Sequence, residues 1–437
     1  MPKPNADSCH DSLVREHAIK TIVIIGNGAA ANSAAETIRS YDPRIQVIMV
    51  ARENVPEFSA CALPDYLAGW VSRSQPFIKK PDDYANMGIE MHWGQSVQRI
   101  DPHTKTVATE SETINYDSLI IATGSRAAVP ALNGSGLRGN FVIKDVADID
   151  AIIAHRPKHV LIVGSGNIGI EVAQALQERE CKVTVIEQRE RILPRIFDGE
   201  PAGRIAEILT SHGISIYTGE SVVAIEGYQR VERAFTDKRA ILCDTVVWAA
   251  GVRQNTELAE SAGIELGKLG GISVDTGMRT NIASIFACGD CVESHDMLTG
   301  KATLSLLWTT AKDQGRIAGA NSLGCKLVYP GALNLVVEDI YGQCAVSMGV
   351  NEGGLCNQDL EIFEGESEKG YWRLLVREDR IMGFQSLGIT TGLGAIMALM
   401  KNRMPLRTVA KILSDQGMMR RADWYLPARP FLDRLKK

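Results

Sequence analysis

Two stretches of the chain share the same order of apolar and polar positions. In the first, Thr21–Ile25 is an unbroken run of β-branched, mostly apolar residues without helical spacing, which predicts a buried parallel strand. The run stops at Gly26-Asn27-Gly28, and an Ala-rich, helix-forming segment continues through Ile38. The pattern therefore predicts a strand that turns at once into a helix.

A glycine turn between a strand and a helix predicts a site for a diphosphate. The free N–H groups and the positive dipole end of the helix point at whatever lies above the turn. Gly26 permits the tight turn, Gly28 leaves room for the pyrophosphate, and Ala31 keeps the helix close to the sheet. A single Gly-x-Gly-x-x-Ala is weak support, because an ordinary turn without a ligand can show it too.

The second stretch, Val160–Glu187, strengthens the prediction because it repeats the whole unit. An apolar strand leads into Gly164, Gly166 and Gly169, and a helix and a second strand follow. That strand ends at Glu187, about 20 residues past the glycines, where an acid usually holds the hydroxyls of an adenosine ribose. Two complete units predict two dinucleotide sites.

The acids that follow the second strand differ between the units. In the first, Ala51 stands where a carboxylate is usual, so we expect Glu53 to replace it as the ribose contact. In the second, Glu187 is followed by Gln188-Arg189 and not by a basic pair placed for a 2′-phosphate. Because the acid repels that phosphate, we expect NADH to be preferred over NADPH.

Two residues near these units are candidates for chemistry. Cys61 follows the first unit in a short Pro-containing turn, and it is either a small buried hydrophobe or a redox thiol at a helix start. The second interpretation is favoured, because a segment after the second strand returns over the ligand crevice. Glu171, one turn into the second helix, either reaches a nicotinamide or is a solvated helix acid, and the sequence leaves both open.

Three further strands end in small residues that let the chain pass close to a bound cofactor. They end in Ala122-Thr123-Gly124, in Ala249-Ala250-Gly251 and in Ala287-Cys288-Gly289-Asp290. The carboxylate of Asp290 suits a ribityl or similar polyol chain. Cys288 and Cys291 have C-x-x-C spacing, but no second pair completes a zinc site, so we expect no metal there.

Composition narrows the class of protein. The 437 residues predict two or three domains, and 45% hydrophobic with 23% charged residues is typical of a soluble globular chain. A net charge of −5 without a basic block argues against nucleic acid and anionic membranes. The apolar stretch Leu387–Met400 is too short to span a bilayer, and the N-terminus lacks the apolar core of an export signal. The nine scattered cysteines suit a reducing compartment. A cytoplasmic location is therefore expected.

With these motifs in place, the chain resembles the flavin- and pyridine-nucleotide-dependent disulfide oxidoreductases from residue 20 onward. The motif order is that of the family: Gly26-x-Gly28, Ala122-Thr123-Gly124, Gly164-x-Gly166 with Glu187, then Gly289-Asp290. The resemblance implies an α/β fold with two Rossmann-like domains. It places FAD on residues 20–135 together with 266–324, and NAD(H) on the inserted residues 136–265. An α+β dimerisation domain is expected at residues 325–437. Residues 1–19, which precede the resemblance, are expected to form a leader.

Within the family, Ser59-Ala60-Cys61-Ala62-Leu63-Pro64 resembles the single-cysteine motif of CoA-disulfide reductases and NADH oxidases. The Cys-x4-Cys pair of glutathione reductase and lipoamide dehydrogenase is missing. The displaced acid Glu53 is more similar to reductases that feed ferredoxin, rubredoxin or nitrite-reducing centres. Two acceptors stay open: a small disulfide, sulfur species or oxygen reached through Cys61, or an iron–sulfur protein reached without cysteine chemistry.

The resulting hypothesis is an NADH-dependent FAD oxidoreductase that forms a homodimer. Cys61 is its expected nucleophile, Glu171 its nicotinamide contact, and Tyr425 or Trp424 of the aromatic tail its acceptor-pocket residues. The expected cofactor contacts are Gly26, Gly28, Ala29, Ala30, Arg52, Glu53, Ala122, Thr123, Gly124, Gly164, Gly166, Asn167, Ile168, Gly169, Glu187, Gly251, Gly289 and Asp290.

Overall fold

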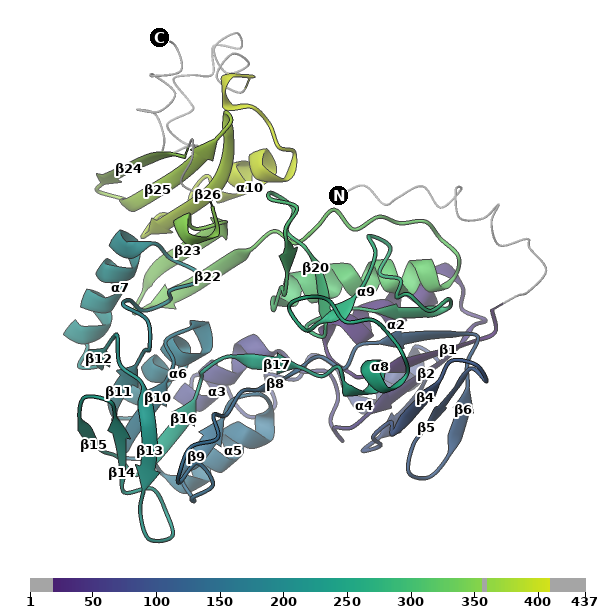
Figure 1. Ribbon diagram of the computed structural model, residues 1–437, viewed down its shortest axis with the longest axis horizontal. Helices are drawn as coiled ribbons and strands as arrows, with labels where there is room; N and C mark the ends of the chain where they lie inside the picture. Colours follow the sequence, from purple (N-terminus) through teal and green to yellow (C-terminus); the bar gives the residue numbers. More distant parts are fainter. Residues whose placement is uncertain (1–18, 356–359, 409–437) are drawn as a thin grey trace. The chain divides into compact units, whose positions relative to one another are not determined.

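The structure is a computed structural model that describes residues 19–355 and 360–408 (Figure 1). These residues form two compact units, each made of separate stretches of the chain. The first unit comprises residues 19–60, 74–126 and 252–332. The second comprises residues 61–73, 127–251 and the described residues from 333 onward.

The first unit is built on a parallel five-stranded sheet. Its strand order is β19-β7-β1-β2-β3, and β1 lies in the middle with a partner on each side. The strands are β1 (Thr21–Ile25), β2 (Gln46–Ala51), β3 (Ile89–Trp93), β7 (Ser118–Ile121) and β19 (Ile285–Ala287). Residues 22–25 are buried, which explains why the apolar run of β1 has no polar alternation.

Two helices of the first unit, α2 (Ala29–Tyr41) and α9 (Trp308–Ser322), pack tightly against each other. A Cβ on Gly315 would lie 2.1 Å from the carbonyl oxygen of Ala30, and one on Gly319 would lie 2.5 Å from that of Ala34. The small residues therefore let the two backbones touch.

Shorter elements complete the first unit. An antiparallel sheet is formed by β4, β5 and β6, a second small sheet by β18, β20 and β21, and a two-stranded ribbon by β8 and β17. Their bounds, with those of the two short helices, are β4 (Arg99–Asp101), β5 (Thr106–Ala108), β6 (Thr113–Asn115), β8 (Ser125–Ala127), β17 (Val252–Gln254), β18 (Ile272–Ser273), β20 (Val292–His295), β21 (Ala302–Thr303), α4 (Pro81–Asn86) and α8 (Glu257–Ser261).

The second unit contains the repeat of the first sheet. Its parallel sheet has the order β12-β11-β10-β16-β9, and a small antiparallel sheet of β13, β14 and β15 accompanies it. The elements are β9 (Asn140–Val142), β10 (His159–Val163), β11 (Lys182–Ile186), β12 (Ser215–Tyr217), β13 (Val222–Glu226), β14 (Arg233–Thr236), β15 (Ala240–Leu242), β16 (Thr245–Trp248), α3 (Leu63–Ala68), α5 (Val146–His155), α6 (Asn167–Glu178) and α7 (Gly199–Ser211).

An antiparallel sheet from the C-terminal part of the chain belongs to the same second unit. Its order is β22-β23-β26-β25-β24, with a tight hairpin that pairs Ile340 with Gln343. The elements are β22 (Leu335–Ile340), β23 (Gln343–Gly349), β24 (Glu361–Ser367), β25 (Gly370–Arg377), β26 (Arg380–Leu387) and α10 (Leu393–Lys401). The sequence pattern predicts strands at 331–342, 371–376 and 381–385 and a helix at 393–401. The structure has β22, β25, β26 and α10 at these places, whereas β23 and β24 were not predicted.

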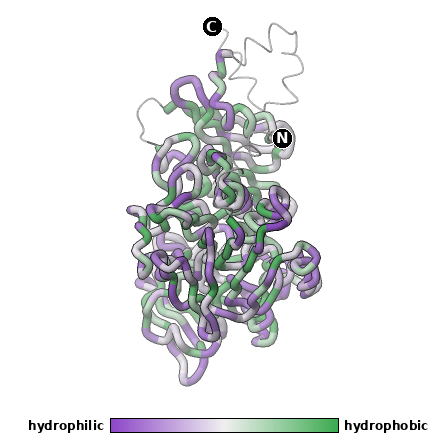
Figure 2. Tube along the Cα trace, turned by 90° about the vertical axis from the view of Figure 1, so that its right-hand side faces the viewer, coloured by the Kyte–Doolittle hydropathy of each residue, from purple (hydrophilic) through white to green (hydrophobic). Residues whose placement is uncertain are grey.

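Parallel sheets that alternate with helices, together with an antiparallel sheet, confirm the predicted α/β class. The residue boundaries of the predicted domains stay a prediction. Among the described residues, no helix is long and apolar enough to cross a membrane, and Figure 2 shows hydrophobic and hydrophilic residues interspersed along the trace.

Candidate functional site

The first glycine turn has the geometry of a diphosphate cradle. Gly26 has φ +118°, and a Cβ there would lie 2.2 Å from the carbonyl oxygen of Ala122, so only glycine fits. Gly28 is the N-cap of α2 and offers no side-chain cap, which leaves the first N–H groups of the helix available. A Cβ at Gly28 would meet nothing within 4 Å, so the space above the turn is open. The residues present therefore fit a bound diphosphate.

Asn27, the middle residue of this turn, is held in place by side-chain hydrogen bonds. Its Nδ2 donates to the carbonyl oxygen of Val55 (3.0 Å), and its Oδ1 accepts from the hydroxyl of Tyr84 (2.8 Å). The same hydroxyl accepts a hydrogen bond from the backbone N–H of Glu57 (2.9 Å). Tyr84 is buried in α4 and thus connects the turn to the segment that precedes Cys61.

A buried ion cluster lies in the same segment. The side chain of Glu57 is only 1% exposed and pairs with Lys79, which also contacts Glu36 at 2.6 Å. Burial raises the pKa of Glu57, and the neighbouring Lys79 opposes that shift. Its Oε1 has no hydrogen-bond partner among the described residues. The sequence did not point to this cluster, because an acid and a lysine 22 positions apart form no recognisable motif.

The structure brings three predicted segments of the first unit together. Ala122 packs against Gly26, and a Cβ on Gly289 would lie 2.8 Å from that of Ala30, at the start of α2. Asp290 accepts a hydrogen bond from the hydroxyl of Ser125 (2.8 Å). These contacts place Asp290 between β19 and β20, next to Ser125 of β8, and its contact with a polyol chain stays a prediction.

The expected ribose acid of the first unit is in a different setting. Glu53 is half exposed, and its carboxylate pairs with the neighbouring Arg52 at 2.9 Å. Both lie just beyond the end of β2, so the position is the one predicted from the sequence. Their contact with a ribose stays a prediction.

The second glycine turn repeats the geometry of the first. Gly164 has φ +104°, and a Cβ there would lie 2.4 Å from the carbonyl oxygen of Ala249. Gly166 is the N-cap of α6, again without a side-chain cap and with nothing within 4 Å of a Cβ. A Cβ on Gly169 would lie 2.2 Å from the carbonyl oxygen of Gly164, which explains the third glycine. This turn also fits a bound diphosphate.

Glu187 connects this second turn to the loop after β11. Its carboxylate accepts hydrogen bonds from the backbone N–H (3.0 Å) and the hydroxyl (2.7 Å) of Ser165, and from the backbone N–H of Arg189 (2.8 Å). Only 8% of the residue is exposed. The acid therefore lies at the glycine turn in a fixed orientation, and a carboxylate has further lone pairs for a ribose hydroxyl.

Cys61 is exposed and lies in the short 3₁₀ turn Ala60–Ala62, directly before α3. Within the second unit, α3 packs against α6, and Arg179 of the α6 C-cap donates a hydrogen bond to the carbonyl oxygen of Leu67. The hydroxyl of Tyr66 donates to Asp150 of α5 (2.7 Å). The segment that follows Cys61 is thus anchored to α5 and to α6, the helix of the second glycine turn.

The other cysteines of interest differ from Cys61 in their surroundings. Cys288 and Cys291 are fully buried, and burial raises the pKa of both thiols. Their thiols are therefore protonated and unreactive at neutral pH. Tyr425 and Trp424, the expected acceptor-pocket residues, lie outside the described residues.

Glu171 does not extend into solvent as an isolated helix acid. It is half-buried on α6 near Glu338 of β22, and burial raises the pKa of both carboxyl groups. Glu338 is not among the residues predicted from the sequence, although its position carries a signal. In β22, Val336, Glu338 and Ile340 alternate as buried residues with exposed ones, so the period of two places Glu338 on the inner face.

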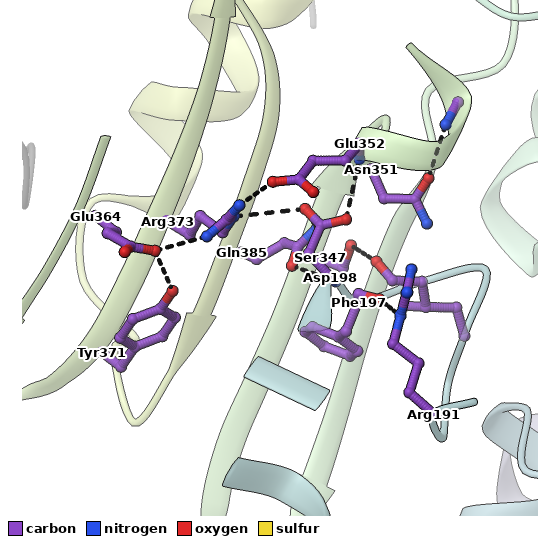
Figure 3. Close-up of polar contacts among 12 residues, drawn as sticks. Arg191, Phe197, Asp198, Ser347, Asn351, Glu352, Glu364, Tyr371, Arg373 and Gln385 are labelled. Atoms are coloured by element: carbon purple, nitrogen blue, oxygen red, sulfur yellow. Dashed lines mark hydrogen bonds and ion pairs between the residues drawn. The ribbon is translucent and has the colours of Figure 1, made fainter. Parts of the chain in front are cut away.

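A polar network joins the loop before α7 to the C-terminal sheet (Figure 3). Asp198 and Gln385 exchange two hydrogen bonds of 2.9 Å, and Asp198 also accepts from the backbone N–H of Glu352 (3.0 Å). Arg373 lies 3.6 Å from Asp198 and pairs with Glu352 and Glu364. The network fixes the chain between β11 and α7 within the second unit.

Comparisons with known proteins agree with this geometry. A family model described as pyridine nucleotide-disulphide oxidoreductase matches residues 20–315. An NADH oxidase of Methanocaldococcus jannaschii is 34% identical over 330 residues, covering 73% of each chain. A CoA-dependent NAD(P)H sulfur oxidoreductase of Pyrococcus abyssi is 32% identical over 326 residues, also covering 73% of each.

A solved structure shows the same likeness in three dimensions. The NAD-dependent persulfide reductase from A. fulgidus superposes with a TM-score of 0.84 at 29% identity, covering 89% of this chain and 78% of that one. The predictions of family, fold class, enzyme class and cofactor type are therefore confirmed. The chain belongs to the pyridine nucleotide-disulphide oxidoreductase family and is an NAD(P)H-dependent FAD oxidoreductase.

Proposed function

We propose that the chain uses NADH to reduce a small sulfur acceptor, a CoA-type disulfide or persulfide, or oxygen, with Cys61 as the reacting thiol. The observation that carries the proposal is an exposed cysteine at the start of a helix that packs on α6, the helix of the second glycine turn. The names of the relatives, NADH oxidase and CoA-dependent sulfur oxidoreductase, support this choice of acceptors.

The two glycine turns are assigned to the two cofactors. The turn at Gly26–Gly28 would hold FAD, with Asp290 for its polyol chain, and the turn at Gly164–Gly166 would hold NADH, with Glu187 for its ribose. In both, open space and uncapped helix N–H groups receive the diphosphate. When bound, FAD supplies the two-electron chemistry that links oxidation of NADH to reduction of the acceptor.

Cys61 would act as a thiolate nucleophile. Its sulfur attacks one sulfur of the disulfide, a mixed disulfide forms, and the other sulfur leaves as a thiolate. The two electrons from NADH then break the mixed disulfide and restore the Cys61 thiolate. The net reaction consumes one NADH, one proton and one disulfide, and yields NAD⁺ and two thiols. With oxygen or peroxide as acceptor, Cys61 would pass through a sulfenic acid instead.

Replacement of Cys61 by serine tests the proposal. We expect Cys61→Ser to lose at least about a hundredfold in anaerobic turnover of CoA disulfide or persulfide, because the nucleophile is removed. Bleaching of the flavin by NADH should persist, because the variant leaves both glycine turns intact. Cys344→Ser, which changes a half-buried cysteine on β23, is the matched control and should keep wild-type turnover.

The rival acceptor, an iron–sulfur protein, requires no cysteine chemistry. Rapid NADH-driven reduction of a rubredoxin or ferredoxin by Cys61→Ser, without disulfide reduction by the wild type, would favour this rival. A protein that binds no flavin and does not oxidise NADH would contradict both.

We also propose that the chain forms a homodimer in the cytoplasm, as the resemblance and the thiol content suggested. Light scattering coupled to gel filtration of the FAD-loaded enzyme tests the first part. A monomer at micromolar concentration would contradict it.

A further inference from the structure

The segment 55–59, which leads toward Cys61, is joined to the first glycine turn by hydrogen bonds. The backbone N–H of Glu57 donates to the hydroxyl of Tyr84 (2.9 Å), and that hydroxyl donates to Oδ1 of Asn27 (2.8 Å). Nδ2 of Asn27 donates to the carbonyl oxygen of Val55 (3.0 Å). The middle residue of the turn thus holds Val55 directly and Glu57 through Tyr84.

Tyr84 itself has little freedom to move. The residue is only 1% exposed, and its ring packs edge to face against Trp93, with the ring centroids 5.2 Å apart. A tyrosine hydroxyl has a single proton to donate, which here goes to Asn27, and its oxygen accepts from the other side. Both hydrogen bonds therefore depend on one hydroxyl in a fixed place.

The side chain of Glu57 provides a second route to the same part of the fold. Its buried carboxylate pairs with Lys79, which also contacts Glu36 of α2 at 2.6 Å. Because α2 begins at the first glycine turn, this route ends on the helix that follows the turn. The carbonyl oxygen of Glu57 also accepts from the backbone N–H of Ile78 (2.8 Å), so its backbone is bound on two sides.

The fixed part of the chain ends two residues before the thiol. Phe58 forms an antiparallel bridge with Phe77, and the backbone N–H of Ser59 donates to the carbonyl oxygen of Pro76 (2.8 Å). From there to Cys61 the chain can extend by no more than about 7 Å. The contacts of the segment 55–59 therefore set the point from which the chain reaches Cys61.

We propose that Tyr84 is a positioning residue for the Cys61 thiol. Its hydroxyl, supported by the ion pairs of Lys79, locks the segment 55–59 to the first glycine turn, so that one anchor places both the thiol and the ligand of that turn. The inference rests on the proposed function, in which FAD binds at this turn and Cys61 reacts. Tyr84 acts through Asn27 and Glu57 and takes no chemical part in the reaction.

The two halves of the proposed reaction place different demands on this anchor. Reduction of the flavin by NADH does not need the thiol, whereas reduction of the disulfide does. A displacement of about 1 Å can slow a chemical step by up to about a hundredfold. Loosening of the segment 55–59 should therefore slow the second half alone.

Anaerobic stopped-flow absorbance of the FAD-loaded enzyme measures the two halves separately. Bleaching by NADH reports the first half, and reoxidation of the reduced enzyme by CoA disulfide reports the second. Tyr84→Phe should bleach within about twofold of the wild-type rate and reoxidise at least about tenfold more slowly. Wild-type rates in both halves, or an equal slowing of both, would overturn the proposal.

Two further variants show whether the effect belongs to this anchor. Tyr116→Phe is the matched control, because Tyr116 is also buried in the first unit but its hydroxyl has no hydrogen-bond partner among the described residues. It should keep both wild-type rates. Glu57→Gln leaves Tyr84 intact but breaks the ion pair with Lys79, so it should also slow the second half alone. A wild-type second half in Glu57→Gln would overturn the supporting role of the ion pairs.

Hydrogen exchange measures the anchor without turnover. The backbone N–H of Glu57 has its acceptor on Tyr84. In FAD-loaded Tyr84→Phe, this N–H should exchange at least about tenfold faster than in the wild type, and in Tyr116→Phe it should exchange at the wild-type rate. Unchanged exchange in Tyr84→Phe would overturn the proposal.

The outcomes distinguish a failure of this inference from a failure of the proposed function. If CoA disulfide reoxidises Cys61→Ser as fast as the wild type, the thiol has no role and the proposed function fails. If Cys61→Ser is slow and Tyr84→Phe is as fast as the wild type, only the positioning role of Tyr84 fails.

Discussion

At the scale of single residues, the two glycine turns show that neighbouring glycines have different reasons to be glycine. Gly26 cannot carry a side chain, because its φ is +118° and Ala122 is too close. Gly28 has an ordinary φ of −77° and open space, so the protein alone does not require glycine there. The proposed diphosphate of FAD would supply the reason for glycine at Gly28.

Alanine substitutions separate these two reasons. Gly28→Ala should leave the free energy of unfolding of the FAD-free protein within about 0.5 kcal/mol of wild type and lower FAD affinity at least about tenfold. Gly26→Ala should lose about 2–4 kcal/mol of stability whether or not FAD is present. Urea unfolding and flavin fluorescence measure the two effects. Full FAD affinity in Gly28→Ala would show that the diphosphate does not bind at this turn.

Glu187 is expected to decide whether the enzyme prefers NADH or NADPH. Glu187→Gln removes the charge that repels a 2′-phosphate, so the ratio of kcat/KM for NADPH to that for NADH should rise about tenfold or more. Steady-state kinetics with both nucleotides measures the ratio. Glu190→Gln, a change at a nearby exposed acid, serves as the control and should leave it unchanged.

At the scale of elements, the sequence predicted those with a strong local pattern. β1, β10 and β11 are apolar runs next to glycine turns, and the structure has them at nearly the predicted residues. β23 and β24 escaped prediction, because their residues include polar ones that face partners the sequence does not reveal. The cradle glycines were found from spacing, whereas Glu338 and Tyr84 act through contacts between segments far apart in the chain.

The contact of α6 with β22 predicts an unusual dependence of stability on pH. The pKa of Glu338 is raised from 4.5 to about 9 in the folded state, so the folded protein holds more protons than the unfolded one between these values. Stability should therefore fall as pH rises through this range. Glu338→Gln should flatten the curve and be more stable than wild type by on the order of 2 kcal/mol at about pH 8. Chemical denaturation at several pH values measures this, and a curve parallel to wild type would contradict it.

At the scale of the whole molecule, the C-terminal sheet belongs to the same compact unit as the second glycine turn. The network of Figure 3 is one reason. Asp198 at the start of α7 is paired with Gln385 and Arg373 of that sheet and with the backbone of Glu352, which lies in the 3₁₀ turn after β23. No sequence motif marks it, since its members are spread over almost 190 positions.

Loss of Arg373 should weaken this attachment. Arg373→Met leaves the carboxylate of Asp198 buried without its cation and should cost about 3–5 kcal/mol of stability. Arg204→Met is the matched control on α7. Among the described residues Arg204 forms ion pairs with the exposed carboxylates of Glu200 and Glu366, and its guanidinium also lies 4.5 Å over the ring of Tyr371, so its loss should cost about 1–2 kcal/mol. Urea denaturation measures both, and equal losses would contradict a special role for the buried network.

The packing of α2 against α9 restricts how the protein can evolve. Gly315 and Gly319 leave no space for a methyl group above Ala30 and Ala34, so a larger residue in either helix would push apart the pair that sets the position of the first turn. Substitutions at these four sites should therefore be inherited as compensating sets, with a gain in volume on one helix matched by a loss on the other. Variation in flavin affinity among natural variants is then expected to map to this helix pair as well as to the residues that touch the flavin.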